Sequence, residues 1–77
     1  MKLQQIYERL QQKFPDGQIK VIDLTGTSDH WEVSISSQSF VDKSRIQQHQ
    51  MVMACFEMEL KTGDIHALSI KTSIPKV

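Results

Sequence analysis

Residues 18–36 read QIKVIDLTGTSDHWEVSIS, and this stretch decides the fold. Its second half, 30–36, alternates strictly between apolar and polar residues, which is the pattern of a strand with one buried face. Its first half, 18–24, is short and rich in β-branched residues and predicts a second strand. The polar, turn-rich residues 25–29 join the two, so the stretch predicts an antiparallel hairpin.

Helical periodicity lies on both sides of this hairpin. Apolar residues recur at steps of three and four over residues 3–14, and the proline-aspartate-glycine sequence at 15–17 should end that helix. The helical period returns over residues 43–60, and Gly63 permits the turn that follows. We expect one apolar stripe along this second helix, formed by Ile46, His49, Met53, Phe56 and Leu60.

Residues 65–72 predict a third strand, before a short tail at 74–77, and His66, Leu68, Ile70 and Thr72 should share one of its faces. The element order is therefore α-β-β-α-β. A right-handed crossover through the second helix would make the third strand parallel to the second. We expect a single α+β domain over residues 1–77, in which a mixed three-stranded sheet is covered on one face by both helices.

Composition excludes several classes of function. A chain of 77 residues has no room for a second domain or for the loops that usually build an enzyme pocket. No phosphate-binding glycine loop, nucleophile elbow or paired-cysteine motif occurs, so we expect no enzymatic activity. No apolar run is long enough to cross a membrane. Nine basic residues balance nine acidic ones, so the chain has no net positive charge that would attract nucleic acid or anionic lipid.

We expect a reduced, cytoplasmic protein. Its one cysteine, Cys55, cannot close an internal disulfide, and its first residues lack the apolar segment of a secretory signal. If the chain is a processed eukaryotic protein, the mitochondrial matrix is the alternative compartment.

Three histidines are the candidate metal ligands. His30 opens the second strand beside a turn, His49 lies on the predicted helical stripe, and His66 begins the third strand. Each histidine could instead have only a structural role, either as a solvated ring beside a turn or as a hydrogen-bonded side chain in the core. Structural zinc needs four ligands, usually in close pairs, and this chain offers no such pairs. A two-iron cluster shared with a thiolate-bearing molecule suits these histidines better than zinc does, because imidazoles can replace thiolates on one iron.

Three segments resemble the motifs of BolA-like proteins. Residues 28–33, SDHWEV, resemble the S-x-H-[FW]-x-V segment of that family. Residues 40–52, FVDKSRIQQHQMV, are similar to its F-x-G-K-x-x-[LVI]-x-[RQ]-H-[RQ]-x-V signature, with Asp42 where a glycine often stands. Residues 65–72, IHALSIKT, are similar to its I-H-A-L-x-[IL]-K-T strand. The resemblance covers nearly the whole chain and implies the family's α-β-β-α-β fold, which is related to the type II KH domain.

The resemblance also implies a function. BolA-like proteins pair with monothiol glutaredoxins that carry a C-G-F-S motif, and they share a [2Fe-2S] cluster with the glutaredoxin and glutathione in cluster delivery and iron homeostasis. The family's C-terminal cluster histidine corresponds to His66, while His49 matches a histidine that we take to be structural and interface-forming. Many members place a further histidine or cysteine in the hairpin loop, but residues 25–29 contain neither. The second ligand is therefore either His30 or absent.

Nucleic-acid binding is the alternative function, since some bacterial members regulate transcription and the fold is KH-like. Lys43, Ser44 and Arg45, at the start of the second helix, are the candidate phosphate contacts. The G-x-x-G loop with which KH domains clamp the nucleic-acid backbone does not occur. A protein-binding module that never touches metal is a third reading, and the sequence leaves open whether the free chain forms a homodimer.

Overall fold

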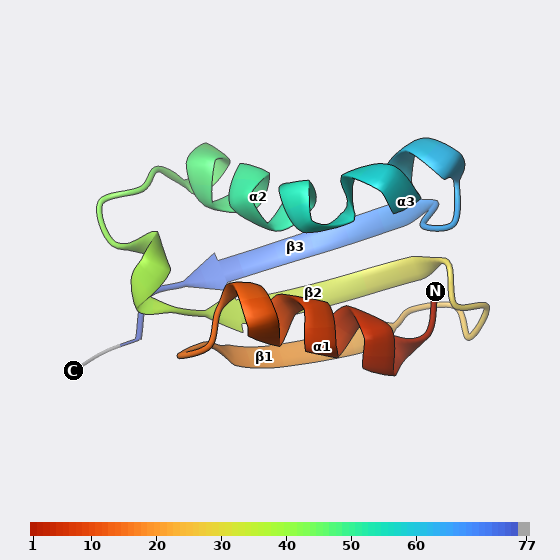
Figure 1. Cartoon of the computed structure of the whole chain (residues 1–77), viewed down its shortest axis with the longest axis horizontal. Helices are drawn as coiled ribbons and strands as arrows, with labels where there is room; N and C mark the ends of the chain where they lie inside the picture. Colours follow the sequence, from red (N-terminus) through yellow and green to blue (C-terminus); the bar gives the residue numbers. More distant parts are fainter. Residues whose placement is uncertain (76–77) are drawn as a thin grey trace.

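The computed structural model describes residues 1–75, so the last two residues of the predicted tail, Lys76 and Val77, lie outside the described part (Figure 1). The elements in chain order are α1 (Leu3–Lys13), β1 (Gln18–Asp23), β2 (His30–Ser36), the 3-10 turn η1 (Gln38–Phe40), α2 (Arg45–Met53), the 3-10 turn η2 (Ala54–Phe56), α3 (Glu57–Thr62) and β3 (Ala67–Ser73). No helix among residues 1–75 has the length and hydrophobicity that crossing a membrane requires.

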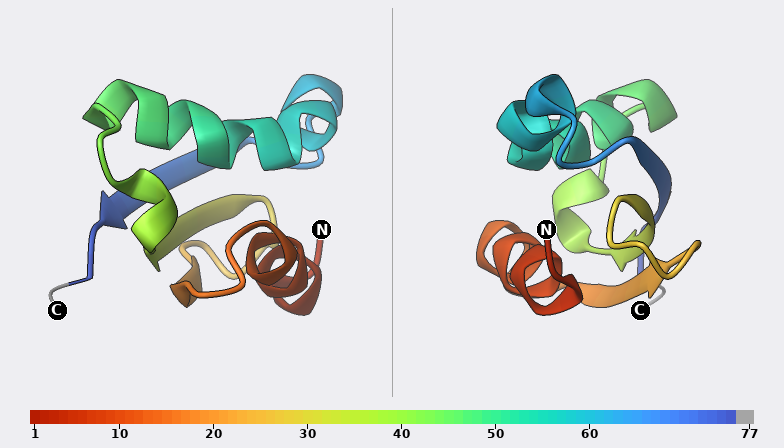
Figure 2. Two further views of the ribbon diagram at one scale, coloured as in Figure 1. Left: turned by 60° about the vertical axis from the view of Figure 1, so that its left-hand side comes forward. Right: turned by 90° about the vertical axis from the view of Figure 1, so that its right-hand side faces the viewer.

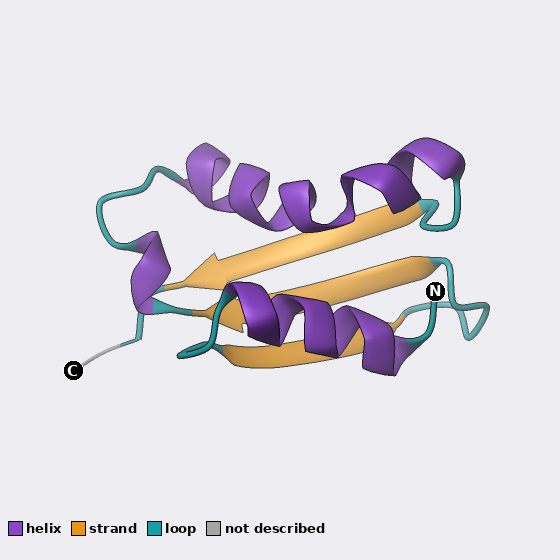
Figure 3. Ribbon diagram, in the orientation of Figure 1, coloured by secondary structure: helices purple, strands orange, loops and turns teal. Residues whose placement is uncertain are grey.

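The sheet has the predicted mixed topology. Its strand order is β1-β2-β3, with β1 antiparallel to β2 and β2 parallel to β3. Val33, in the central strand, lies opposite Val21 of β1 and Ile70 of β3. The helices lie together on one face of the sheet, and the connection through α2 and α3 carries the chain back to the end where β2 begins (Figures 2 and 3). The α+β class and the two-layer arrangement are thus confirmed.

The core lies between the helices and the sheet. The central strand alternates as predicted, with Trp31, Val33 and Ile35 at most 1% exposed. The remaining fully or almost fully buried apolar side chains come from α1 and the residue that follows it, the two 3-10 turns, α2 and the segment before β3: Ile6, Leu10, Phe14, Phe40, Val52, Phe56 and Ile65. Burying each large apolar side chain contributes about 1.5–3 kcal/mol, so these residues supply most of the favourable free energy of folding.

An aspartate joins the end of α1 to the end of β2. Asp16, in the turn after α1, accepts hydrogen bonds from the Ser37 hydroxyl (2.9 Å) and from the Gln38 main-chain N–H (2.8 Å). These two bonds lower the pKa of Asp16, with the bond from Gln38 having the larger effect. Gly17 lies beside it in a crowded place, because an added Cβ would lie only 3.0 Å from the Phe14 carbonyl oxygen. We call this group the Asp16–Ser37 clamp.

The second helix differs from the prediction. It is not continuous over residues 43–60: α2 begins at Arg45, because Ser44 caps it, and the 3-10 turn η2 separates α2 from α3. The helix breaks because Phe56 leaves helical dihedrals (φ −125°, ψ 21°) while its ring is completely buried in the core. Asp42, before α2, has φ 64°, the left-handed region that glycine adopts most easily.

The predicted apolar stripe is confirmed only in part: Phe56 is buried and Leu60 packs against the core, but Val52 takes the place that Met53 was expected to hold. Ile46 is 71% exposed and Met53 is 47% exposed, whereas Val52 and Phe56 are completely buried. One residue corresponds to a rotation of about 100° around the helix. The face that meets the sheet is therefore set by Val52 and Phe56, which are four residues apart and lie one above the other.

The third strand begins two residues later than predicted, at Ala67. Leu68, Ile70 and Thr72 share the half-buried face, as expected. His66 does not share it: it precedes the strand, and its side chain is 60% exposed. The reason lies in the hydrogen bonds of the entering segment, because the His66 main-chain N–H donates to the Asp29 carbonyl oxygen (2.8 Å) and turns the residue toward the hairpin loop.

Candidate metal centre

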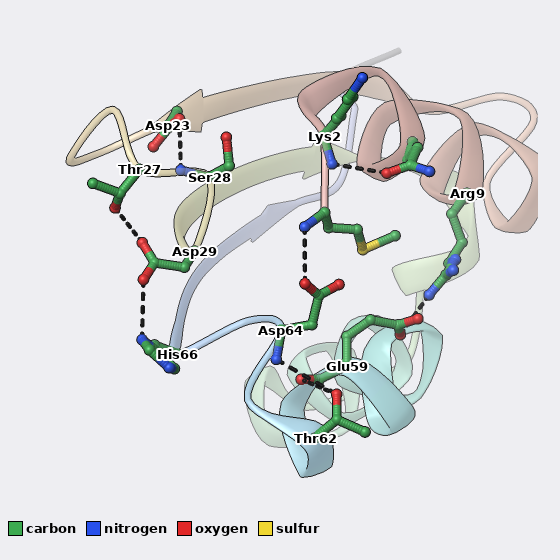
Figure 4. Close-up of polar contacts among 12 residues, drawn as sticks. Lys2, Arg9, Asp23, Thr27, Ser28, Asp29, Glu59, Thr62, Asp64 and His66 are labelled. Atoms are coloured by element: carbon green, nitrogen blue, oxygen red, sulfur yellow. Dashed lines mark hydrogen bonds and ion pairs between the residues drawn. The ribbon is translucent and has the colours of Figure 1, made fainter.

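Asp29, His30 and His66 meet at the end of the sheet where β2 and β3 both begin. Because these strands are parallel, their first residues are neighbours, and His30 lies opposite Ala67 in the register. The hairpin loop thereby comes to lie beside the segment that enters β3. Figure 4 shows the Asp29 carboxylate and the His66 ring pointing toward one another across this junction.

The carboxylate of Asp29 lies between the two imidazoles. His30 Nδ1 lies 2.8 Å from Asp29 Oδ1, and His66 Nδ1 lies 3.0 Å from Asp29 Oδ2. The ring centroids are 5.7 Å apart, with the rings at 78° to each other. The side chains are 26% exposed for Asp29, 38% for His30 and 60% for His66, so another molecule can reach both rings.

The hairpin loop is tied down by its own polar groups. The Asp23 carboxylate accepts hydrogen bonds from the main-chain N–H groups of Gly26 (3.0 Å) and Ser28 (3.1 Å). Gly26 and Ser28 both have positive φ, so the loop winds tightly around the Asp23 side chain. The Thr27 hydroxyl donates to Asp29 Oδ1, and this bond orients the carboxylate. Asp29 therefore faces β3 before any ligand arrives.

The segment that carries His66 is held just as firmly. Gly63 ends α3 in the left-handed region, with φ 84°. The main-chain N–H groups of His66 (2.8 Å) and Ala67 (3.2 Å) both donate to the Asp29 carbonyl oxygen. A Cβ on Gly63 would lie 3.8 Å from the His66 ring, so this turn passes directly beside the imidazole. The backbone of both histidines is thus fixed, while their rings stay exposed.

Electrostatics favour an ionised carboxylate at this centre. The hydrogen bond from Thr27 lowers the pKa of Asp29 most, that from His30 adds to it, and the pKa falls to about 2. An ionised carboxylate only accepts hydrogen bonds, so each Nδ1 that faces it carries a proton. The lone pair of each neutral ring is then on Nε2. Metal-binding histidines are commonly oriented by a carboxylate in this way.

The structure brings together two of the three predicted histidines and adds a residue that sequence reasoning missed. His30 and His66 lie in one cluster with Asp29, and one potential ligand atom from each lies within 4.8 Å of the others. The only signal for Asp29 was its place directly before His30 in the loop. Aspartate is common in turns because it bonds to nearby main-chain groups, so that signal was weak.

His49 lies elsewhere, on α2. It is half-buried, and with Arg45, Ile70, Lys71 and Thr72 it lines a hollow of about 220 Å³ beside β3. It is thus neither in the core, as its place on the predicted stripe implied, nor part of the cluster around Asp29.

Lys43, Ser44 and Arg45 are exposed at the start of α2. The Ser44 hydroxyl accepts a hydrogen bond from the Gln47 main-chain N–H (3.1 Å), and the Gln47 side chain accepts one from the Ser44 N–H (2.8 Å). The chain's own groups therefore already occupy two of the donors at this helix terminus.

Comparisons with known proteins agree with this fold. A family model described as BolA-like protein matches residues 7–76. BolA-like protein 3 of Homo sapiens is 42% identical over 69 residues, which cover 87% of this chain and 63% of the human protein. The chain thus spans less than two thirds of that relative's length. Uncharacterized protein RP812 of Rickettsia prowazekii is 40% identical over 67 residues, 86% of each chain.

A solved structure shows the same fold. BolA1 from Arabidopsis thaliana superposes with a TM-score of 0.83 and 28% sequence identity, covering 94% of this chain and 89% of that one. The family model, the identity to the relatives and the shared α-β-β-α-β architecture together show that the chain belongs to the BolA-like family.

Proposed function

We propose that this protein is a non-enzymatic adaptor that pairs with a monothiol glutaredoxin and accepts and delivers a [2Fe-2S] cluster shared with that partner and glutathione. Membership of the BolA-like family supports the proposal. The observation that carries it is the pair of exposed imidazoles, His30 and His66, held by one ionised carboxylate at the edge of the molecule. Two imidazoles are half of the four-ligand set that a two-iron cluster needs.

Each residue has a distinct role in this proposal. His66 is the first ligand, because it is the more exposed ring and its position matches the family's cluster histidine. His30 is the second ligand, in place of the loop histidine or cysteine of other members. Asp29 is a positioning residue: it is hydrogen-bonded to His30 Nδ1 and lies 3.0 Å from His66 Nδ1, and so leaves Nε2 of each ring free for iron. The thiolates come from the partner and from glutathione, and the cluster is the cargo.

The adaptor should release its cargo in acid. An imidazole binds iron only when neutral, because protonation removes the lone pair that the metal needs. The complex should therefore weaken as the solution is made acidic.

The test mixes the cluster-free chain with a cluster-loaded monothiol glutaredoxin and records visible circular dichroism. The wild-type chain should convert the glutaredoxin spectrum into a new one, and His66→Ala should abolish the conversion. Glu8→Ala, an exposed change on α1, is the control and should behave as wild type. An unchanged spectrum with wild type, or equal conversion by His66→Ala, would refute the proposal.

Nucleic-acid binding is the second candidate, and one observation favours it: Arg45, His49 and Lys71 line a single hollow, and Lys43, two residues before Arg45, is exposed. Lys71 also lies 3.3 Å from Glu32, which partly offsets its charge. If this surface contacts phosphates, a mobility shift should weaken with salt and disappear in the Lys43→Ala/Arg45→Ala double variant. A shift that the double variant retains would place any binding elsewhere.

A further inference from the structure

The Asp29 carboxylate faces the Nδ1 atoms of the two rings, and this arrangement has a second use. In the cluster proposal above, Nδ1 only carries a proton and Nε2 binds iron. Yet His30 Nδ1 and His66 Nδ1 lie 2.8 Å and 3.0 Å from the two oxygens of one ionised carboxylate. A cation placed between these atoms would meet two nitrogen ligands and one oxygen ligand on the same molecule.

We propose that the free chain binds one divalent ion of the zinc class between Asp29, His30 and His66. Imidazole nitrogen and carboxylate oxygen are both ordinary zinc ligands, and zinc is bound by three protein ligands with one open position in many enzymes. Calcium and magnesium are disfavoured because they require oxygen ligands almost throughout. The carboxylate offsets one of the two positive charges of the ion.

The distances suit such an ion after small side-chain rotations. Zinc ligands lie about 2.0–2.2 Å from the metal, so two ligands of a tetrahedral ion are about 3.4 Å apart. The ligand atoms here lie within 4.8 Å of one another. The main chain need not move, because hydrogen bonds from His66 and Ala67 to the Asp29 carbonyl oxygen already hold the two segments together.

The protons are accounted for within the two rings. The ion displaces the proton from each Nδ1 to solvent, and each Nε2 takes up one proton from solvent, so both imidazoles stay neutral. A ring in that tautomer has no lone pair on Nε2. The bound ion should therefore block cluster uptake, and this last step alone rests on the proposed function. The free chain would be protected by an exchangeable ion until a partner arrives.

Cobalt(II) is the probe for the site, because it takes zinc positions and absorbs visible light. The wild-type chain, alone in solution, should bind one Co²⁺ per molecule, and Zn²⁺ should displace it. Asp29→Asn, His30→Ala and His66→Ala should each weaken binding at least as much as the roughly 10–100-fold loss typical of removing an outer-shell partner. His49→Ala removes the third histidine and is the matched control, with unchanged affinity.

Two further measurements keep the result interpretable. Fluorescence of Trp31, the one tryptophan, reports unfolding in urea and shows whether each variant still folds. Nitrogen-15 NMR of the histidine rings should show the proton moving from Nδ1 to Nε2 in His30 and His66 when Zn²⁺ is added. Absence of Co²⁺ binding by the folded wild type, equal loss in His49→Ala, or rings that keep the Nδ1 proton with Zn²⁺ bound would overturn the proposal.

The same assays separate this proposal from the proposed function. Ion binding is measured without glutaredoxin, so failure of cluster uptake leaves the ion result intact. Asp29→Asn also distinguishes ion binding from cluster uptake, because Asp29 is a ligand of the proposed ion but only a positioning residue for the cluster ligands. If both proposals hold, zinc-loaded chain should delay the change in circular dichroism until a chelator is added. Undelayed conversion by zinc-loaded chain would overturn the blocking step.

Discussion

At each end of the sheet an aspartate carboxylate bridges two segments of the chain, but the two carboxylates have different roles. At one end, Asp16 joins the turn after α1 to the end of β2, and at the other, Asp29 joins the hairpin loop to the start of β3. In both places a carboxylate with a lowered pKa connects segments that are distant in the sequence. The partners differ: Asp16 meets a main-chain N–H and the buried Ser37, whereas Asp29 meets two exposed imidazoles.

This difference shows where the functional information lies. A carboxylate whose partners are a main-chain group and a hydroxyl with no exposed surface can only hold the fold together. A carboxylate whose partners are exposed imidazoles leaves nitrogen lone pairs within reach of another molecule. The character of the partners, and not the carboxylate or its pKa, therefore separates a structural clamp from a candidate binding centre.

The largest expected effect is the loss of cargo binding in His66→Ala. This variant should lose cluster uptake entirely, while the free energy of unfolding should change by no more than about 1 kcal/mol, because the ring is mostly exposed. Visible circular dichroism and urea unfolding measure the two effects separately. A large loss of stability would mean that the Asp29 end is also a structural clamp, and the contrast between the two ends would fail.

Ser37→Ala tests the opposite end. The Ser37 hydroxyl donates to Asp16 and accepts from the Ser39 main-chain N–H, and both partners would lose that hydrogen bond. The free energy of unfolding should fall by about 1–3 kcal/mol. Co²⁺ binding should be unaltered. A variant as stable as wild type in urea would show that the Ser37 hydroxyl contributes nothing to the Asp16–Ser37 clamp.

Gly63→Ala should lower stability without removing the metal centre. A residue with a Cβ costs roughly 1–2 kcal/mol in the left-handed region, and Gly63 has φ 84°. The added Cβ would be in ordinary contact with the His66 ring at 3.8 Å, so the ring can keep its place. Thermal unfolding and Co²⁺ titration should therefore respond differently. Equal loss in both would show that the turn also sets the ring position.

The smallest effect should appear in the pH dependence of Asp16→Asn. The pKa of Asp16 in the folded protein lies below its ordinary value of 3.8, so its contribution to stability is complete above that pH and is lost as the pH falls through the lowered pKa. Urea midpoints of wild type and variant should differ at about pH 6 and converge as the pH falls below the ordinary value of 3.8 and through the lowered pKa. A difference that stays constant over this range would contradict the lowered pKa.

The sheet was predictable because its signals are local. The strict alternation in residues 30–36 sets both the limits and the buried face of β2, and the length of the following segment requires a crossover, which makes β3 parallel. The break at η2 was not predictable in the same way. Val52 and Met53 are adjacent and similarly apolar, so periodicity cannot decide which one faces the sheet until the buried Phe56 fixes the rotation.

The candidate metal centre was predictable only in part. His30 and His66 could be chosen by residue type and by the family's motifs, and the structure places them side by side. The role of Asp29 depends on the parallel register of β2 and β3 and on the Thr27 hydroxyl that turns its side chain. Neither is visible in the spacing of residues along the chain, because both arise from tertiary contacts.

The junction between Asp29 and His66 has a consequence for biogenesis. Residues from the two halves of the chain form one centre only after the crossover has closed, so an unfinished or misfolded copy holds two unconnected imidazoles. Under the proposed function, such a copy could not take up a cluster, so uptake would occur only in folded molecules. Cargo that binds only the finished molecule would in turn hold it in that state by mass action.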